Sequence, residues 1–192
     1  MEVSWEILEQ AIAGCEKCSL HTQIHHKVPG QGDRKAELMF IGEGPGQDED
    51  LQGLAFVGRA GQLLTKMIAA MGLTRDQVYI CNVVKCRPPQ NRTPTDEEAS
   101  CCLPYLRAQF ALVRPRVIVL LGATAARAVL GPESRITRDR GKFVCKKGVW
   151  FMPTYHPAAL LRDESKKKDV WQDLQQVMKK LDELKGGAGP GQ

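Results

Sequence analysis

The sequence lacks any apolar run long enough to cross a membrane as a helix, which takes about 20 residues. Its first residues, MEVSWEILEQAIAG, also lack the basic start and continuous apolar stretch of a secretory signal. We therefore expect a cytoplasmic protein with no membrane segment. No internal repeat or linker divides the 192 residues, so we expect one domain over 1–185 and a disordered tail over 186–192.

Two phosphate-binding signatures are also missing. The GK[ST] of a P-loop is absent, and the match to GxGxxG is poor. The most glycine-rich stretch, GEGPG at 42–46, follows an apolar run at 38–41. Such a turn lets backbone N–H groups approach a ligand closely, although a plain strand-to-helix turn is the alternative. Acids at 43 and 48–50 would repel a bare phosphate. They favour a ligand with hydrogen-bond donors or developing positive charge.

Cysteine is abundant instead, with seven residues. An odd number without a secretory signal argues against a disulfide framework, so metal ligation is the better interpretation. Cys15 and Cys18 form a CxxC motif directly after a helix that Ser4 can cap. This spacing suits a shared metal centre or a redox dithiol. The histidines at 21, 25 and 26 are typical of surface or nucleic-acid contacts more than of ligands.

Apolar runs and helical patterns alternate along the chain. Strands are expected at 38–41, 77–84, 116–121 and 150–154, helices at 62–71, 95–113, 122–131 and 168–184, and hairpin-like strands within 136–151. This order predicts an α/β fold whose parallel sheet is covered on both faces. The glycine-rich loop, Asn82 and His156 each follow the carboxyl end of a strand, where such sheets build ligand sites.

The net charge is +5, and basic residues concentrate between 127 and 168. A basic half beside an acidic pocket predicts a polyanion partner, with an ordinary solvated surface as the alternative.

Four segments together resemble the motifs of family 4 uracil-DNA glycosylases, the iron–sulfur members of the uracil-DNA glycosylase superfamily. They are GEGPG (42–46), FVGRAG (56–61), NVVKCRPP (82–89) and YHPAALLR (155–162). The resemblance implies a three-layer αβα sandwich around a short, mostly parallel four-stranded sheet, with a [4Fe–4S] cluster. It implies a monofunctional DNA repair glycosylase that flips uracil out of DNA and hydrolyses its N-glycosidic bond. It further implies a monomer that acts on single- or double-stranded DNA in a prokaryotic cytoplasm, at the nucleoid.

The resemblance assigns the cluster to Cys15, Cys18, Cys86 and Cys102. Cys101 is the alternative to Cys102, and because neighbours on a helix point about 100° apart, only one of them should face the cluster. Zinc is the alternative metal, although the cysteine spacing is not that of a compact zinc knuckle. The resemblance gives the cluster a structural role. The remaining cysteines, Cys81 and Cys145, are interpreted as small core residues.

The resemblance also implies roles at the pocket. Uracil binding falls to Glu43, Gly44, Phe56, Asn82 and His156. The Asn82 amide can accept from N3–H and donate to O4 of uracil, a pattern opposite to that of cytosine. Phe56 would stack on the base. Catalysis falls to Glu43 and to His156, a neutral donor to uracil O2. Better-known relatives carry an aspartate where this chain has Gly44, so no general base stands there.

In those relatives a tyrosine at the position of Gly46 blocks the methyl group of thymine. This chain must exclude thymine by another residue, for which Glu49 and Phe56 are the candidates. DNA contacts fall to Arg59, to Leu160 as an apolar wedge and to Arg162 on a phosphate. Lys85, Arg87 and Arg92 could also meet phosphates. Core packing is the alternative for Leu160 and Leu161.

Three functions remain in view. The first is a glycosylase. The second is a covalent binder of uracil-DNA, which needs a KRRIH-type insertion that the sequence lacks. The third is a non-catalytic metal-containing module that binds nucleic acid through its basic half.

Overall fold

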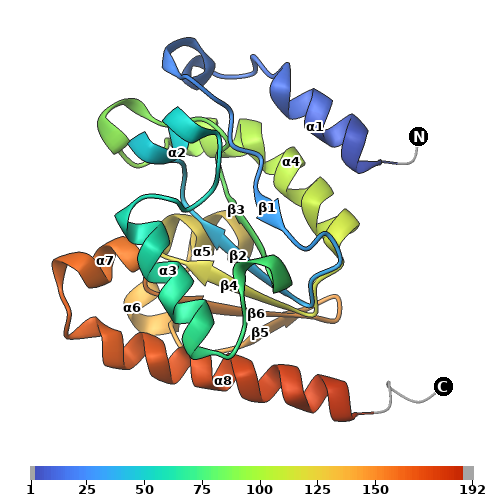
Figure 1. The fold of residues 1–192 in the computed structure, drawn as a ribbon, viewed down its shortest axis with the longest axis vertical. Coiled ribbons are helices and arrows are strands. Elements are labelled where there is room, and N and C mark those ends of the chain that lie inside the picture. Colours follow the sequence, from blue (N-terminus) through green and yellow to red (C-terminus); the bar gives the residue numbers. More distant parts are fainter. Residues whose placement is uncertain (1–2, 188–192) are drawn as a thin grey trace.

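The computed structural model describes residues 3–187, which form one twisted sheet with helices on both faces (Figure 1). The strands are β1 (Gln31–Gly32), β2 (Leu38–Gly42), β3 (Tyr79–Asn82), β4 (Val117–Leu121), β5 (Val144–Lys146) and β6 (Val149–Thr154). Their order in the sheet is β1-β3-β2-β4-β6-β5. The α/β class expected from the sequence is thus confirmed.

The expected four-stranded sheet is wrong, because the sheet has six strands. The four inner strands, β3, β2, β4 and β6, run parallel, whereas β1 and β5 pair antiparallel at the edges. Each edge strand has only two or three residues. Strands this short leave no apolar run in the sequence.

The helices are α1 (Trp5–Ala13), α2 (Gln47–Gln52), α3 (Arg59–Ala70), α4 (Asp96–Val113), α5 (Ala123–Leu130), α6 (Ile136–Asp139), α7 (Pro157–Arg162) and α8 (Lys166–Gly186). Three single turns of 3₁₀ helix cover Ser19–Gln23, Arg75–Gln77 and Pro89–Asn91. Two sequence expectations need correction. Residues 136–139 form a helix rather than a strand, and α8 continues into the glycines expected to begin the tail. The rest of that tail, 188–192, lies outside the described residues.

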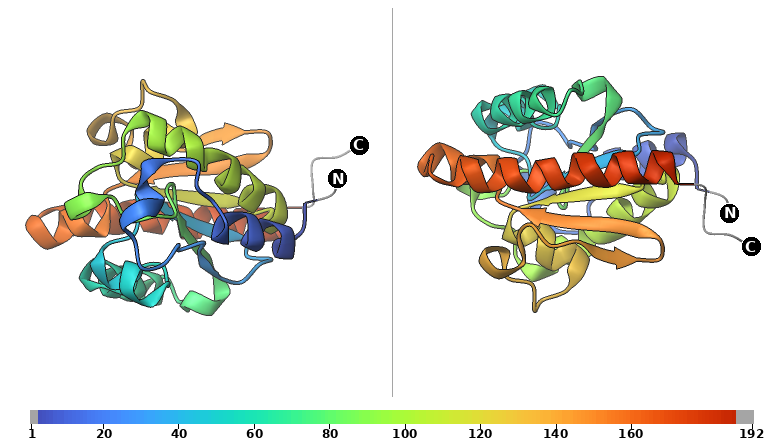
Figure 2. Two further views of the ribbon diagram at one scale, coloured as in Figure 1. Left: turned by 90° about the horizontal axis from the view of Figure 1, so that it is seen from above. Right: turned by 90° about the horizontal axis from the view of Figure 1, so that it is seen from below.

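Alternate residues of each inner strand point to opposite faces of the sheet. Leu38 and Phe40 of β2 pack with α3, α7 and α8, whereas Met39 and Ile41 pack with α1, α4 and α5. Seen from above and from below, α3 lies on one side of the sheet and α4, α5 and α6 lie on the other, while α8 runs across the view (Figure 2). Among residues 3–187, no helix is long and apolar enough to cross a membrane.

Candidate functional site

A cavity of about 600 Å³ opens at the carboxyl ends of the parallel strands. Its wall takes residues from the loop after each inner strand, namely Glu43 after β2, Asn82 at the end of β3, Gly122 after β4 and His156 after β6. Phe56 completes this part of the wall. Loops at this edge of a parallel sheet converge on one point, so side chains far apart in sequence share one site.

Asn82 is a deeply buried polar residue of this cavity. The residue is 1% exposed, and within the described chain its Oδ1 atom has no hydrogen-bond partner. An unpaired buried acceptor costs about 1–3 kcal/mol. The absence of a side chain at Gly42 keeps the space beside this oxygen open. A Cβ there would lie 2.5 Å from Asn82 Oδ1 and 2.4 Å from the Phe56 ring. The site therefore accommodates a ligand that donates a hydrogen bond to Asn82.

His156 supplies a hydrogen-bond donor to the same cavity. Its Nδ1 atom accepts from the Ala158 backbone N–H at 3.0 Å, so in the neutral ring the proton lies on Nε2. Burial, reinforced by the nearby Arg162 charge, lowers the pKa of His156 to about 4. The ring stacks on Phe56 with centroids 5.6 Å apart. Near pH 7 the side chain is thus a neutral, oriented donor.

The lowered pKa of His156 predicts a pH-dependent stability. Its pKa is about 4 in the folded protein and about 6.5 in the unfolded chain. The unfolded state therefore takes up the proton first as the pH falls. We expect full stability above pH 6.5 and a loss of roughly 2 kcal/mol between pH 7 and pH 5. Urea unfolding at both pH values measures this, and His156→Gln should remove most of that difference.

Glu43 and Glu49 have different surroundings. The Glu43 carboxylate accepts from the Thr124 hydroxyl at 2.5 Å, which fixes it at the cavity wall. Glu49 is 9% exposed and accepts three backbone N–H groups, from Gly46, Val57 and Gly58. It therefore holds the glycine-rich loop against the segment that carries Phe56. Sequence reasoning missed Thr124, whose only signal is a polar residue shortly after a buried strand.

Gly44 has a steric reason to be glycine. A Cβ at this position would lie 2.7 Å from Val84 Cγ2, closer than carbon atoms approach in folded proteins. A larger side chain would thus have to displace Val84, which is fully buried.

A buried group of hydrogen-bonded side chains holds the strand end that precedes His156. Two residues earlier, the Thr154 hydroxyl donates to Asp173 of α8 at 2.6 Å, and Arg140 donates two hydrogen bonds to the same carboxylate. Asp173 and Thr154 are buried. Because these polar groups satisfy each other, they make a rigid support for the histidine.

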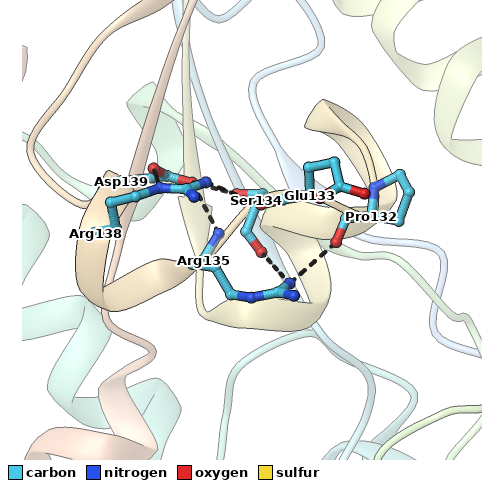
Figure 3. Close-up of polar contacts among 6 residues, drawn as sticks. All are labelled: Pro132, Glu133, Ser134, Arg135, Arg138 and Asp139. Atoms are coloured by element: carbon cyan, nitrogen blue, oxygen red, sulfur yellow. Dashed lines mark hydrogen bonds and ion pairs between the residues drawn. The ribbon is translucent and has the colours of Figure 1, made fainter.

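A second support shapes the wall through Ile136, which lines the cavity. The Asp139 carboxylate accepts from Arg138 Nε at 2.6 Å, the Arg135 N–H at 2.8 Å and the Ser134 hydroxyl at 3.2 Å (Figure 3). The Arg138 guanidinium holds the pKa of this carboxyl below its usual range. These contacts close α6 into the compact turn that replaces the expected strand.

The residues expected to contact DNA differ in their exposure to solvent. Arg162 is exposed and lines the cavity, and Arg59 is exposed at the start of α3. Lys85, in contrast, is 2% exposed, so the expectation that it meets phosphates is wrong. Arg92 lines the cavity and forms a bidentate salt bridge with Glu98.

Leu160 does not match its expected role as a wedge. It is 2% exposed and belongs to the core, whereas Leu161 is 41% exposed. On a helix as short as α7, which begins at Pro157, only one of two neighbours can face the sheet. The alternative of core packing therefore holds for Leu160 and fails for Leu161.

This difference predicts opposite effects for two neighbouring substitutions. Leu160→Ala should lower the free energy of unfolding by about 2–5 kcal/mol because it empties a core position. Leu161→Ala should change stability by less than about 0.5 kcal/mol, yet weaken DNA binding. Urea unfolding and fluorescence anisotropy with a DNA duplex separate the two effects. A destabilised Leu161→Ala would contradict the assignment.

Five cysteines gather around a second, small cavity. They come from the segment after α1, the loop after β3 and the first turns of α4, and are Cys15, Cys18, Cys86, Cys101 and Cys102. All seven cysteines are free. Cys102 is 4% exposed, while the Cys101 thiol donates to the Lys17 carbonyl at 3.5 Å. Cys81 is buried as expected, but Cys145 is exposed on β5, so its assignment to the core is wrong.

The thiols of the cysteine cavity have the donor chemistry of a metal-binding site. Burial raises the pKa of the Cys18 and Cys102 thiols and that of Cys86 to about 12. Such thiols need a positive metal centre to ionise, and clustered thiolates favour soft metals or iron–sulfur groups. Within residues 3–187, no three His, Cys, Asp or Glu side chains stand ready to hold a single metal ion. The donor chemistry thus fits a thiolate-bound group, without a preformed single-ion site.

Comparison with known proteins agrees with this geometry. Residues 29–175 match the family model described as the uracil DNA glycosylase superfamily. A type-4 uracil-DNA glycosylase of Sulfurisphaera tokodaii is 44% identical, over 91% of this chain and 83% of its own length. Those of Thermotoga maritima (90% and 92%) and Archaeoglobus fulgidus (97% and 96%) are also 44% identical. The chain therefore belongs to the type-4 branch of the uracil-DNA glycosylase superfamily.

Proposed function

We propose that this protein is a monofunctional DNA repair glycosylase that hydrolyses the N-glycosidic bond of uracil in DNA and leaves an abasic site. The observation that carries the proposal is the buried, unpaired Asn82 Oδ1 atom in a cavity shared with the His156 donor. Uracil offers a matching N3–H donor and O2 acceptor. Similarity to proteins named as type-4 uracil-DNA glycosylases supports the same substrate.

The polar groups of the cavity suggest how the bond breaks. As the bond lengthens, negative charge develops on uracil and positive charge on the sugar. His156 Nε2–H stabilises the first by donating to O2, and it needs no reorganisation because Ala158 already orients the ring. The Glu43 carboxylate, held by Thr124, stabilises the sugar cation or orients the attacking water.

The substrate must enter as a flipped-out nucleotide, since the reactive bond is hidden in stacked DNA. Phe56 offers a ring for stacking at the cavity wall, a contact worth about 1–3 kcal/mol per base. We assign Arg162 and Arg59 to the phosphates and the exposed Leu161, in place of Leu160, to the gap left in the DNA. Gly44 leaves the cavity floor free of a side chain.

We further infer that Cys15, Cys18, Cys86 and Cys102 hold a [4Fe–4S] cluster. When bound, this group supplies a cross-link between chain segments rather than a reactive centre. The four thiols join α1, the loop after β3 and α4. The proposal includes a monomer that acts in a prokaryotic cytoplasm, at the nucleoid.

Selectivity for uracil should depend on the Asn82 amide. Asn82→Asp replaces the donor to O4 by a second acceptor, which opposes uracil and admits the amino group of cytosine. We expect uracil excision to fall at least tenfold and cytosine excision to become detectable. Oligonucleotides that differ only in that base measure both rates. Unchanged selectivity would remove Asn82 from base recognition.

Uracil excision itself tests the proposed function. The purified protein, at sub-stoichiometric concentration, is mixed with a labelled oligonucleotide that holds one uracil, and abasic sites are then cleaved with alkali. Multiple turnovers are expected. A stable crosslink without turnover would instead identify a covalent binder. DNA binding without either product would identify a non-catalytic module.

A further inference from the structure

Lys85 is an unusual residue in this core. Its side chain is 2% exposed, yet lysine is almost never buried unless it is paired. The ammonium donates to the Asn82 backbone carbonyl at 2.6 Å and to Gln109 Oε1 at 2.7 Å, two neutral oxygens. Neither the cavity at the sheet edge nor the DNA surface explains this arrangement, because Lys85 reaches neither.

The contacts of Lys85 connect the uracil cavity with the cysteine cavity. Lys85 lines the cysteine cavity together with Cys102. Its side chain holds the end of β3, where Asn82 faces the uracil cavity. Cys86 follows directly in sequence. One residue thus contacts both the base-reading strand end and the cysteine site.

Gln109, on α4, extends the hydrogen-bond network of Lys85. Its Nε2 atom donates to the Pro29 carbonyl at 2.7 Å and to the Tyr79 hydroxyl at 3.1 Å. The Lys85 carbonyl in turn accepts from the Val28 N–H at 2.7 Å. A buried polar network with satisfied members is rigid and favours a single arrangement. Gln109 is fully buried and lines neither cavity, so it can act only through its neighbours.

We propose that Lys85, supported by Gln109, is a positioning residue for base recognition that fixes the Asn82 end of β3 to the cysteine site. Asn82 Oδ1 has no partner of its own, so its direction depends on the backbone that carries it. Within residues 3–187, Lys85 is the side chain that hydrogen-bonds to the Asn82 carbonyl. This inference rests on the proposed role of Asn82 in uracil recognition.

The test compares Lys85→Met and Gln109→Leu with Lys27→Met. Lys27 also lines the cysteine cavity, but its ammonium donates to the Ala13 carbonyl, far along the chain from Asn82. Each variant is assayed for bound iron and sulfide, for urea unfolding, and for KM and kcat on uracil-containing DNA. We expect the first two to raise KM about tenfold, within the range of coupling between sites. Their kcat should change less, and Lys27→Met, compared at equal iron content, should keep the wild-type KM.

Whether KM or kcat changes in a variant distinguishes a loss of positioning from a loss of stability. A variant that is merely less stable has fewer active molecules, which lowers the apparent kcat and leaves KM unchanged. Lys85 lines the cysteine cavity, so loss of iron from Lys85→Met would leave its KM without a clear cause. Gln109 does not line that cavity, so the KM of Gln109→Leu decides whether the network positions Asn82. Wild-type KM in an iron-containing Gln109→Leu would overturn the proposal. Absence of uracil release by the wild type would instead refute the proposed function.

Discussion

Replacing His156 by alanine is expected to lower kcat for uracil release by a factor of 10²–10³. Loss of one preorganised donor raises a barrier by about 3–4 kcal/mol when charge develops on the atom it contacts. KM should change much less, because the donor matters most when uracil leaves as an anion. Single-turnover excision at saturating enzyme measures the step directly.

The orientation of the His156 ring makes this prediction specific. Ala158 occupies Nδ1, so only Nε2 can serve the substrate. His25→Ala is a matched control, since His25 is exposed and bonded to Asp50 outside the uracil cavity. That control should keep wild-type kcat. Circular dichroism of both variants checks folding.

The pH profile distinguishes a neutral donor from a proton donor. With a pKa of about 4, His156 stays neutral from pH 8 to pH 5, so kcat should be nearly constant across this range. A proton donor with an ordinary pKa would give a rate that rises as the pH falls through about 6.5. Such a rise in kcat, absent from His156→Ala, would contradict the neutral-donor mechanism.

Replacing Cys86 by serine is expected to remove the iron–sulfur group and destabilise the fold. Loss of a comparable covalent cross-link costs small domains about 2–5 kcal/mol, which should lower Tm by roughly 10 °C for a chain of this length. Visible absorption, iron content and thermal unfolding measure the two effects. Cys102→Ser should behave in the same way.

Cys101 provides the matched control for the cysteine assignment. It is the direct neighbour of Cys102 and lines the same cavity, but its thiol donates to the Lys17 carbonyl. Cys101→Ser should therefore keep its iron and a Tm within a few degrees of the wild type. If Cys101→Ser lost the iron and Cys102→Ser retained it, the ligand set would have to be exchanged.

Sequence patterns anticipated the parts of this fold that depend on local order. A T-x-x-E capping box, which can be identified in the sequence at 95–98, starts α4 through two reciprocal hydrogen bonds. Apolar runs marked the inner strands because strands buried on both faces need consecutive apolar residues. The short edge strands and α6 carry no such pattern. Strand β1 forms because β3, distant in the sequence, supplies its partners. Strand β5 and helix α6 instead depend on partners close in the sequence, which no apolar run marks.

By itself, the sequence determined the α/β class, the family and the residue types available for chemistry. It could not decide which side chains are buried, because burial depends on neighbours distant along the chain. Lys85 was expected to meet DNA and Leu160 to act as a wedge; both are buried. The tertiary structure decided that Nε2 of His156 carries the donor, since the turn into α7 brings the Ala158 N–H to Nδ1. It also decided that Asn82 keeps a free acceptor, since this depends on which loops converge at the sheet edge.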